Sequence, residues 1–193
     1  MDTPICGNYI YVRTSPTTSE KVLVTEEGVK KIDWLKKLEN YGITEKHFDD
    51  QKNKLSTQFG CIASNHDVIH TLFNKLILEN SDFHTLKMIY FEHALFLYEE
   101  GGDCFKNLQL VKNLQLARKM ELLRYKQSGI GIEKVKIRSH EESCSFCQAL
   151  NGKIYSIEEA LKIMPIPCKD CTFILYRDKR NFCRCTYAPI LDY

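Results

Sequence analysis

Six of the nine cysteines lie close together near the end of this chain, and their spacing constrains the fold more than any other feature. They form two Cys-x-x-Cys pairs and one Cys-x-Cys pair: Cys144 and Cys147, Cys168 and Cys171, Cys183 and Cys185. A Cys-x-x-Cys turn lets two thiolates reach one ion, and a zinc site needs sulfur ligands about 2.3 Å from the metal. Two such turns about twenty residues apart fit the spacing of a zinc-ribbon-like site. The pattern therefore predicts a structural Zn²⁺, but it names no reaction.

The sequence leaves the set of ligands open. One candidate set contains the first two pairs, Cys144, Cys147, Cys168 and Cys171. A second set replaces Cys168 with Cys183 or Cys185, and a third uses all six thiolates to bridge two ions. An iron–sulfur cluster is a further alternative, because thiolate sites also hold iron.

Charge is distributed unevenly along the chain, although the net charge is only +2. Residues 1–103 carry 11 Lys and Arg against 16 Asp and Glu, whereas residues 104–193 carry 16 against 9. A basic C-terminal half could face phosphate or an acidic protein. The candidate nucleic-acid or partner-binding residues are cations around the cysteines: Lys169, Arg177, Lys179, Arg180 and Arg184.

Aromatic residues of the same segment have two interpretations. Tyr155, Phe173, Tyr176 and Tyr187 could stack on nucleic-acid bases. Alternatively, Phe173 and Tyr187 pack the cysteine-rich module against the rest of the protein, because small modules lack enough core of their own.

The stretch from residue 25 to residue 127 carries apolar residues at helical spacing. Caps and stops divide it into helices that begin near Thr25, Thr44, Ser64, Ser81 and Asp103. The helix expected over 82–100 is apolar around nearly all of its circumference, which is typical of the middle of a bundle. Short connections between these helices favour antiparallel neighbours.

Strands are expected at both ends of the chain. Runs over 9–13 and 21–25 flank a Ser-Pro-Thr turn and predict an N-terminal hairpin. Over 134–138, Val and Ile alternate with Lys and Arg, which indicates a strand that leads into the first cysteine turn. Two further strands are expected over 172–176 and 182–187.

Gly129 and Gly131 mark the expected domain boundary, because the periodicity changes there from helical to two-residue. Residues 1–130 are predicted to form a helical body and residues 131–193 a cysteine-rich zinc-binding module. The expected fold class is α+β and mostly helical: a helical bundle with an N-terminal β-hairpin and a C-terminal zinc-ribbon-like module.

We expect no leader, and no apolar run reaches the roughly 18 residues that would span a bilayer. We therefore expect no membrane contact and a cytoplasmic, reducing location. In such a compartment paired cysteines hold metal more often than they form disulfides.

The C-terminal segment resembles one known family. Its order is Cys144-x-x-Cys147, then Leu150-Asn-Gly-Lys-Ile154, a proline-containing stretch, and Cys183-Arg-Cys185. This order is similar to the C-terminal segment of the Mu F-like phage minor head proteins and covers roughly residues 135–190. That family usually has a histidine shortly before the final Cys-Arg-Cys, and here Cys171 is the nearest candidate substitute. The resemblance implies a ligand set that includes the last cysteine pair and a role as a phage-head-type assembly component.

Enzyme readings receive less support. His140 and Glu142 stand before Pro167-Cys168-x-x-Cys171 in the order of a zinc-deaminase signature, but they follow a strand rather than opening a helix. His140 is also a reserve ligand for the cysteine site. His66 and His70 share a helix face without the glutamate of a metalloprotease motif.

The sequence as a whole favours a non-catalytic zinc-containing binding protein whose basic C-terminal half contacts nucleic acid or a protein partner. The alternatives are the assembly component and a zinc-dependent hydrolase or deaminase-like enzyme.

Overall fold

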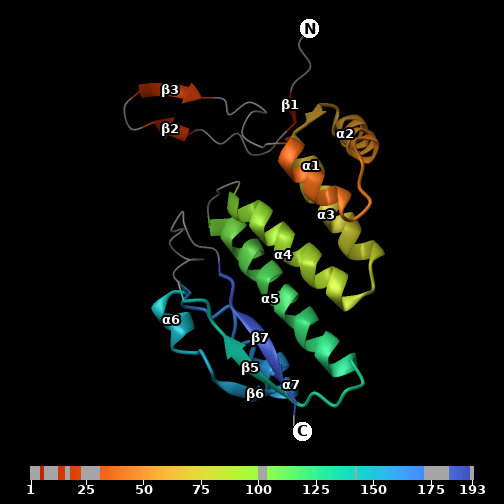
Figure 1. The fold of residues 1–193 in the computed structure, drawn as a ribbon. Helices are drawn as coiled ribbons and strands as arrows, with labels where there is room; N and C mark the ends of the chain where they lie inside the picture. Colours follow the sequence, from red (N-terminus) through yellow and green to blue (C-terminus); the bar gives the residue numbers. More distant parts are fainter. Residues whose placement is uncertain are drawn as a thin grey trace. The chain divides into compact units, whose positions relative to one another are not determined.

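The structure is a computed structural model that describes residues 5–6, 13–15, 18–22, 31–99, 104–141, 143–171 and 183–191. The chain divides into two compact units, Met1–Leu78 and Glu79–Tyr193 (Figure 1). Among the described residues, no helix combines the length and the apolar character needed to cross a membrane.

Three helices dominate the first unit: α1 (Lys31–Glu39), α2 (Glu45–Phe59) and α3 (Asn65–Glu79). The expected starts near Thr44 and Ser64 are confirmed, whereas the start expected near Thr25 lies outside the described residues. Gly60 ends α2 in the left-handed conformation with φ of 68°, which glycine adopts without steric cost.

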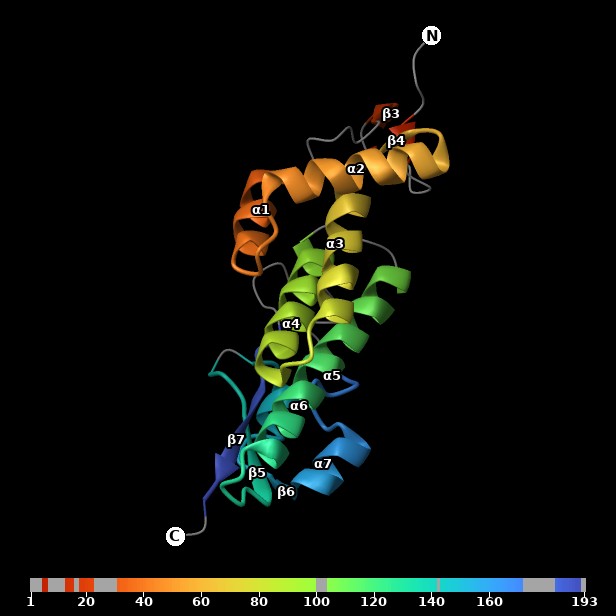
Figure 2. The same ribbon diagram turned by 90° about the vertical axis from the view of Figure 1, so that its right-hand side faces the viewer.

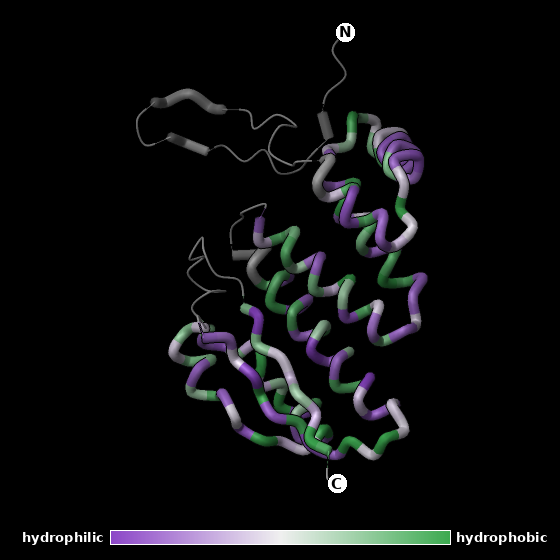
Figure 3. Tube along the Cα trace, in the orientation of Figure 1, coloured by the Kyte–Doolittle hydropathy of each residue, from purple (hydrophilic) through white to green (hydrophobic). Residues whose placement is uncertain are grey.

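Large apolar side chains fill the interior of the first unit. Leu38, Phe48 and Phe73 are essentially inaccessible to solvent. Trp34 meets Phe73 edge to face, with ring centroids 6.0 Å apart, an arrangement that aromatic pairs prefer. Helix α2 is largely hydrophilic (Figure 3), and Phe48 is its buried residue. Apolar packing of this kind therefore holds the unit together.

Short strands accompany these helices. The antiparallel pair β2 (Arg13–Ser15) and β3 (Thr18–Val22) forms the expected N-terminal hairpin, displaced by a few residues from the predicted runs. A parallel pairing that the sequence did not indicate joins β1 (Ile5–Cys6) to β4 (Ile62–Ala63).

The second unit is built on two long helices, α4 (Phe83–Glu99) and α5 (Cys104–Gln127), which pack side by side (Figures 1 and 2). Both match their predicted positions closely. Helix α4 buries Ile89, Phe96 and Leu97 together with His93, as expected of a helix that is apolar all round.

A three-stranded antiparallel sheet lies against α5 in the order β6-β5-β7. Its members are β5 (Lys134–Arg138), β6 (Ile154–Ser156) and β7 (Thr186–Ile190). Two short helices, α6 (Ser145–Gln148) and α7 (Ile157–Ile163), connect into it. The capping serine of α7 is Ser156, which accepts a hydrogen bond from the Glu159 backbone N–H.

Two hydrogen bonds fix β7 to α5. The Tyr187 backbone N–H donates to the Glu121 carboxylate at 3.2 Å, and the Tyr125 hydroxyl donates to the Tyr187 carbonyl at 3.0 Å. The Tyr187 side chain itself is 3% exposed. Tyr187 therefore packs the sheet against the helices. Of its two expected roles, base stacking and internal packing, the structure supports packing.

The two units do not divide where the sequence suggested. The expected boundary at residue 130 falls inside the second unit, because α5 and the sheet share one core. The separation of a helical body from a zinc-binding module at residue 130 stays a prediction. The described chain is mostly helical with a small antiparallel sheet, as expected.

The last predicted strand also differs. Strand β7 begins at Thr186, and residues 183–185 lead into it without pairing. The backbone here carries Cys183 and Cys185 to the other cysteines instead of continuing the sheet. The strand expected over 172–176 lies outside the described residues.

Candidate metal centre

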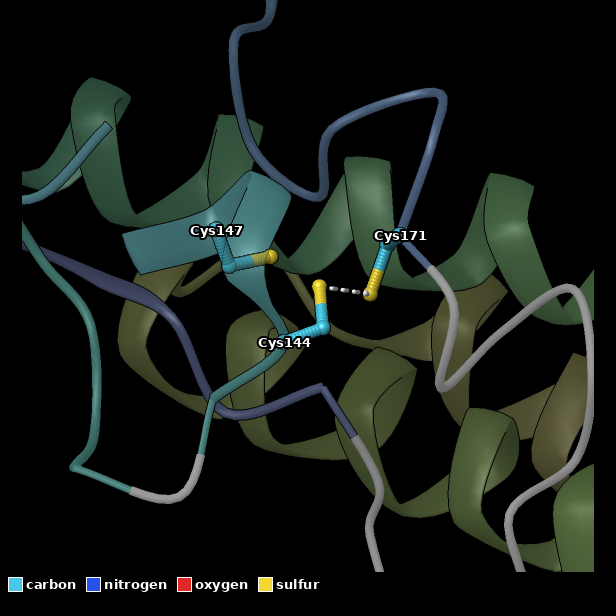
Figure 4. Close-up of side chains that lie close together, drawn as sticks. All are labelled: Cys144, Cys147 and Cys171. Carbon is cyan, nitrogen blue, oxygen red and sulfur yellow. Dashed lines mark hydrogen bonds between the residues drawn. The ribbon is translucent and has the colours of Figure 1, made fainter. Parts of the chain in front are cut away.

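The first cysteine pair is positioned by a single helical turn. Cys144 is the N-cap of α6, and the Gln148 backbone N–H donates to its carbonyl at 2.9 Å. Cys147 lies three residues further on, so both sulfur atoms reach the same side of the turn. Figure 4 shows these two side chains converging with that of Cys171, which comes from a separate loop.

The second pair lies on a tight turn after α7. The Cys171 backbone N–H donates to the Cys168 carbonyl at 3.0 Å. Ile166 is completely buried just before this turn and anchors it in the core. Cys171 is also completely buried, whereas Cys168 is half-buried.

The third pair enters from the chain segment before β7. Cys183 and Cys185 are buried, at 4% and 1% exposure, while Arg184 between them is exposed. This alternation points both sulfur atoms inward. Since Tyr187 is tied to α5 two residues later, the approach of this pair is fixed by the helical core.

The six sulfur atoms gather in one cluster. Cys144 Sγ lies 3.9 Å from Cys171 Sγ, and Cys147 Sγ lies 3.8 Å from Cys168 Sγ. Two groups have all their sulfur atoms within 4.8 Å of one another: Cys144, Cys147 and Cys171, and Cys147, Cys183 and Cys185. Cys147 belongs to both groups and stands at the centre of the cluster.

These distances fit a metal site. Sulfur atoms at the corners of a tetrahedron with bonds of about 2.3 Å are about 3.8 Å apart. All six cysteines are free thiols, so no disulfide accounts for their approach. The cluster could therefore hold a metal ion.

Crowding among the thiols perturbs their acidity. Hydrogen bonds with Cys171, Cys183 and Cys185 raise the pKa of the Cys147 thiol. Hydrogen bonds from Cys147 and Cys183 lower the pKa of Cys185 to about 3, and the Ser143 hydroxyl, 3.8 Å from its sulfur, contributes in the same direction. A bound cation would favour ionisation of such thiols.

Other predicted site residues are placed as follows. Lys169 and Arg184 are exposed beside the cluster, and His140 is exposed after β5, outside both ligand groups. Arg177, Lys179 and Arg180, as well as Glu142, lie outside the described residues. The deaminase arrangement that combined His140 with the cysteines thus receives no geometric support from His140.

The two histidines of α3 lie side by side on one face of the helix. The His66 and His70 rings stack with centroids 6.2 Å apart, and His66 Nδ1 lies 3.6 Å from the Asp67 carboxylate. Within the described part of the chain, only the cysteines assemble three or more close metal-ligating atoms.

Cys61, in the first unit, is disulfide-bonded.

Sequence reasoning missed two features of the second unit. The first is the buried Glu121, whose carboxylate binds Lys87, Arg118 and the β7 backbone. The second is the row of exposed cations on β5, which was recognised as a strand pattern but not as a surface. The two-residue spacing of Lys134, Lys136 and Arg138 was the sequence signal that could have indicated this surface.

Comparisons with protein families, with curated proteins and with solved structures found no match to this chain. The site is therefore interpreted from its own chemistry.

Proposed function

We propose that the cysteine cluster holds one structural zinc ion and that the protein is a non-catalytic binding protein. The observation that carries this proposal is the convergence of three separate chain segments on one group of buried thiols. Zinc is the ion that tetrahedral thiolate sites most commonly hold. A single ion would join the turn of α6, the loop after α7 and the segment before β7 into a zinc-ribbon-like module.

The proposed ligands are Cys144, Cys147, Cys171 and one member of the last pair, Cys183 or Cys185. Burial supports this set, because each of these cysteines is buried while Cys168 is only half-buried. Serine variants distinguish the members. Cys147→Ser should abolish zinc binding, and Cys168→Ser should retain it.

Four protein thiolates leave no open position for water or substrate, so such an ion stabilises the fold and activates no nucleophile. Within the described residues both ligand groups consist of cysteines alone, which supports this reading. The proposed role of the module is therefore to present a surface, and its basic residues make nucleic acid the proposed partner.

Nucleic-acid binding is tested by titrating the full-length zinc-loaded protein into labelled single-stranded and duplex DNA at several salt concentrations. The expected affinity falls steeply as salt rises, because neutralised phosphates release counterions. A matched sample treated with a strong chelator should lose binding. No affinity for any nucleic acid at low salt would contradict the proposed partner.

A second candidate function is a phage-head-type assembly component. It is supported by the position of the Cys183-Arg-Cys185 motif, whose sulfur atoms lie in the same cluster as the Cys-x-x-Cys motif of α6. This role predicts a discrete oligomer of the zinc-loaded protein in light scattering, and a monomer at all concentrations would oppose it.

A further inference from the structure

The sheet of the second unit has two unlike faces. On the central strand β5, Val135 and Ile137 are completely buried toward the helices. Lys134, Lys136 and Arg138 alternate with them and are exposed on the opposite face. We call this opposite side the outer face, and it is defined by these three cations and the residues paired with them.

The residues paired with the three cations carry no charge. Cross-strand partners lie on the same face of a sheet, so they define the surroundings of each cation. Lys134 pairs with Ser156 and Ile190, Lys136 with Ile154 and Ala188, and Arg138 with Thr186. The outer face is therefore a basic row bordered by small and aliphatic side chains.

The three cations make no ion pair with any described residue, in contrast to other basic residues of the unit. Lys87 binds Glu121 and Lys126 binds Glu158. Helices α5 and α7 both lie on the other side of the sheet, and no described element covers the outer face (Figures 1 and 2). No described residue of the protein therefore neutralises the positive charge of this row.

Spacing and composition identify the partner that fits. Alternate residues of a strand lie about 6.7 Å apart, so the row spans about 13 Å in a straight line. A polyanion with regularly repeated phosphates is complementary to such a row. The two tyrosines of the flanking strands, Tyr155 and Tyr187, pair with Val135 and Ile137 and belong to the other face.

The lack of described aromatic residues on the outer face argues against base stacking, which single-strand binders use. Duplex RNA recognition draws on contacts to 2′-hydroxyl groups, whereas this face offers mainly cations. We propose that the outer face binds the phosphate backbone of duplex DNA without reading its sequence. This inference rests on the proposed nucleic-acid function and locates it on β5 rather than on Lys169, Arg184 and their neighbours.

The test uses full-length zinc-loaded protein and a short duplex of mixed sequence. The variant K134Q/K136Q/R138Q removes the row, and the control K112Q/K119Q/K162Q removes three exposed cations from α5 and α7. Both variants change the net charge equally, and neither touches the cysteine cluster. Zinc content and circular dichroism establish that each is folded.

The outer-face variant should lower the slope of log K against log salt by about 2.7, since each phosphate contact contributes about 0.9. The control variant should keep most of the wild-type slope of log K against log salt. Equal losses in both variants, or wild-type binding to single strands or duplex RNA in preference to duplex DNA, would overturn this inference and leave the proposed function standing. No wild-type binding to any nucleic acid would overturn both.

Discussion

The first unit and the cysteine-rich end of the second unit have interiors of different chemistry. In the first unit the buried side chains are large and apolar, and Trp34, Phe48 and Phe73 are representative. In residues 143–171 and 183–191, five of the buried groups are cysteines. Apolar packing stabilises the first unit, and we propose that metal ligation contributes at the cysteine-rich end of the second.

The lengths of the helices and strands explain this difference between the two interiors. Helix α3 has 15 residues and buries a continuous apolar stripe that includes Ile69, Leu72, Phe73 and Leu76. Helix α6 has four residues, α7 seven, and β6 three, so each contributes little apolar area. Segments of that size need another source of stability, and a bound zinc ion supplies it in small domains.

Metal removal should produce the largest contrast between the two regions. Structural zinc contributes about 10–16 kcal/mol in zinc-finger peptides, so chelation should expose residues 143–171 and 183–191 to hydrogen exchange. The first unit should keep its structure. Trp34 is the only tryptophan and lies in the first unit, so its fluorescence reports that unit directly. A fluorescence change on chelation, or unchanged exchange near the cysteines, would break the comparison.

Phe73→Ala probes the apolar side of the comparison. The ring is completely buried and packs on Trp34, so its loss should cost about 3–5 kcal/mol in unfolding followed by tryptophan fluorescence. Leu78→Ala on the same helix is the control, because Leu78 is 86% exposed and should change stability little. Zinc content should stay the same in both variants, and a loss of zinc from Phe73→Ala would show that the two interiors depend on each other.

Glu121→Gln tests the polar link between β7 and the helices. The buried carboxylate accepts from Lys87 at 2.7 Å, from Arg118 at 3.2 Å and from the Tyr187 N–H. Removing its charge leaves Arg118 buried and uncompensated, which should cost about 3 kcal/mol in denaturant unfolding of the second unit. Glu158→Gln is the control, since its pair with Lys126 is exposed and worth about 0–1 kcal/mol. An equal effect of the two substitutions would contradict the importance of this link.

Helix caps should give the smallest effects, and one in each unit can be compared. Ser156→Ala and Ser64→Ala each remove a hydroxyl that accepts a backbone N–H, at a cost of about 1 kcal/mol. Ser156→Ala should destabilise the second unit. Ser64→Ala should destabilise only the first unit, whose unfolding is followed by Trp34 fluorescence. Costs well above this size would indicate a role beyond capping.

The Ser64 cap also has a pH signature. Burial raises the pKa of the Asp67 carboxyl, but hydrogen bonds from His66 and Ser64 outweigh it and hold the pKa below its usual value. A lowered folded pKa adds stability above the unfolded value of about 3.9, and this stability is lost as the pH falls through the folded pKa. Ser64→Ala should reduce this acid dependence, measured as tryptophan-detected stability between neutral and acidic pH.

Local signals in the sequence predicted most of the helical structure. Ser64 and Ser156 marked helix starts because capping depends on neighbouring residues alone. The gathering of Cys144, Cys147 and Cys171 could also be anticipated, since ligand spacing encodes it. Non-local features could not be read in this way. The contact of Glu121 with Tyr187 joins residues 66 positions apart, and no local sequence signal encodes it.

Zinc content combined with mapping of unreacted thiols tests the central claim most directly. Purified protein should contain one zinc per chain, and alkylation under native conditions should modify Cys168 and one member of the last pair while sparing the other four cluster cysteines. Two zinc ions per chain would require the six-thiolate arrangement. A protein without zinc, in which all six thiols react, would contradict the account.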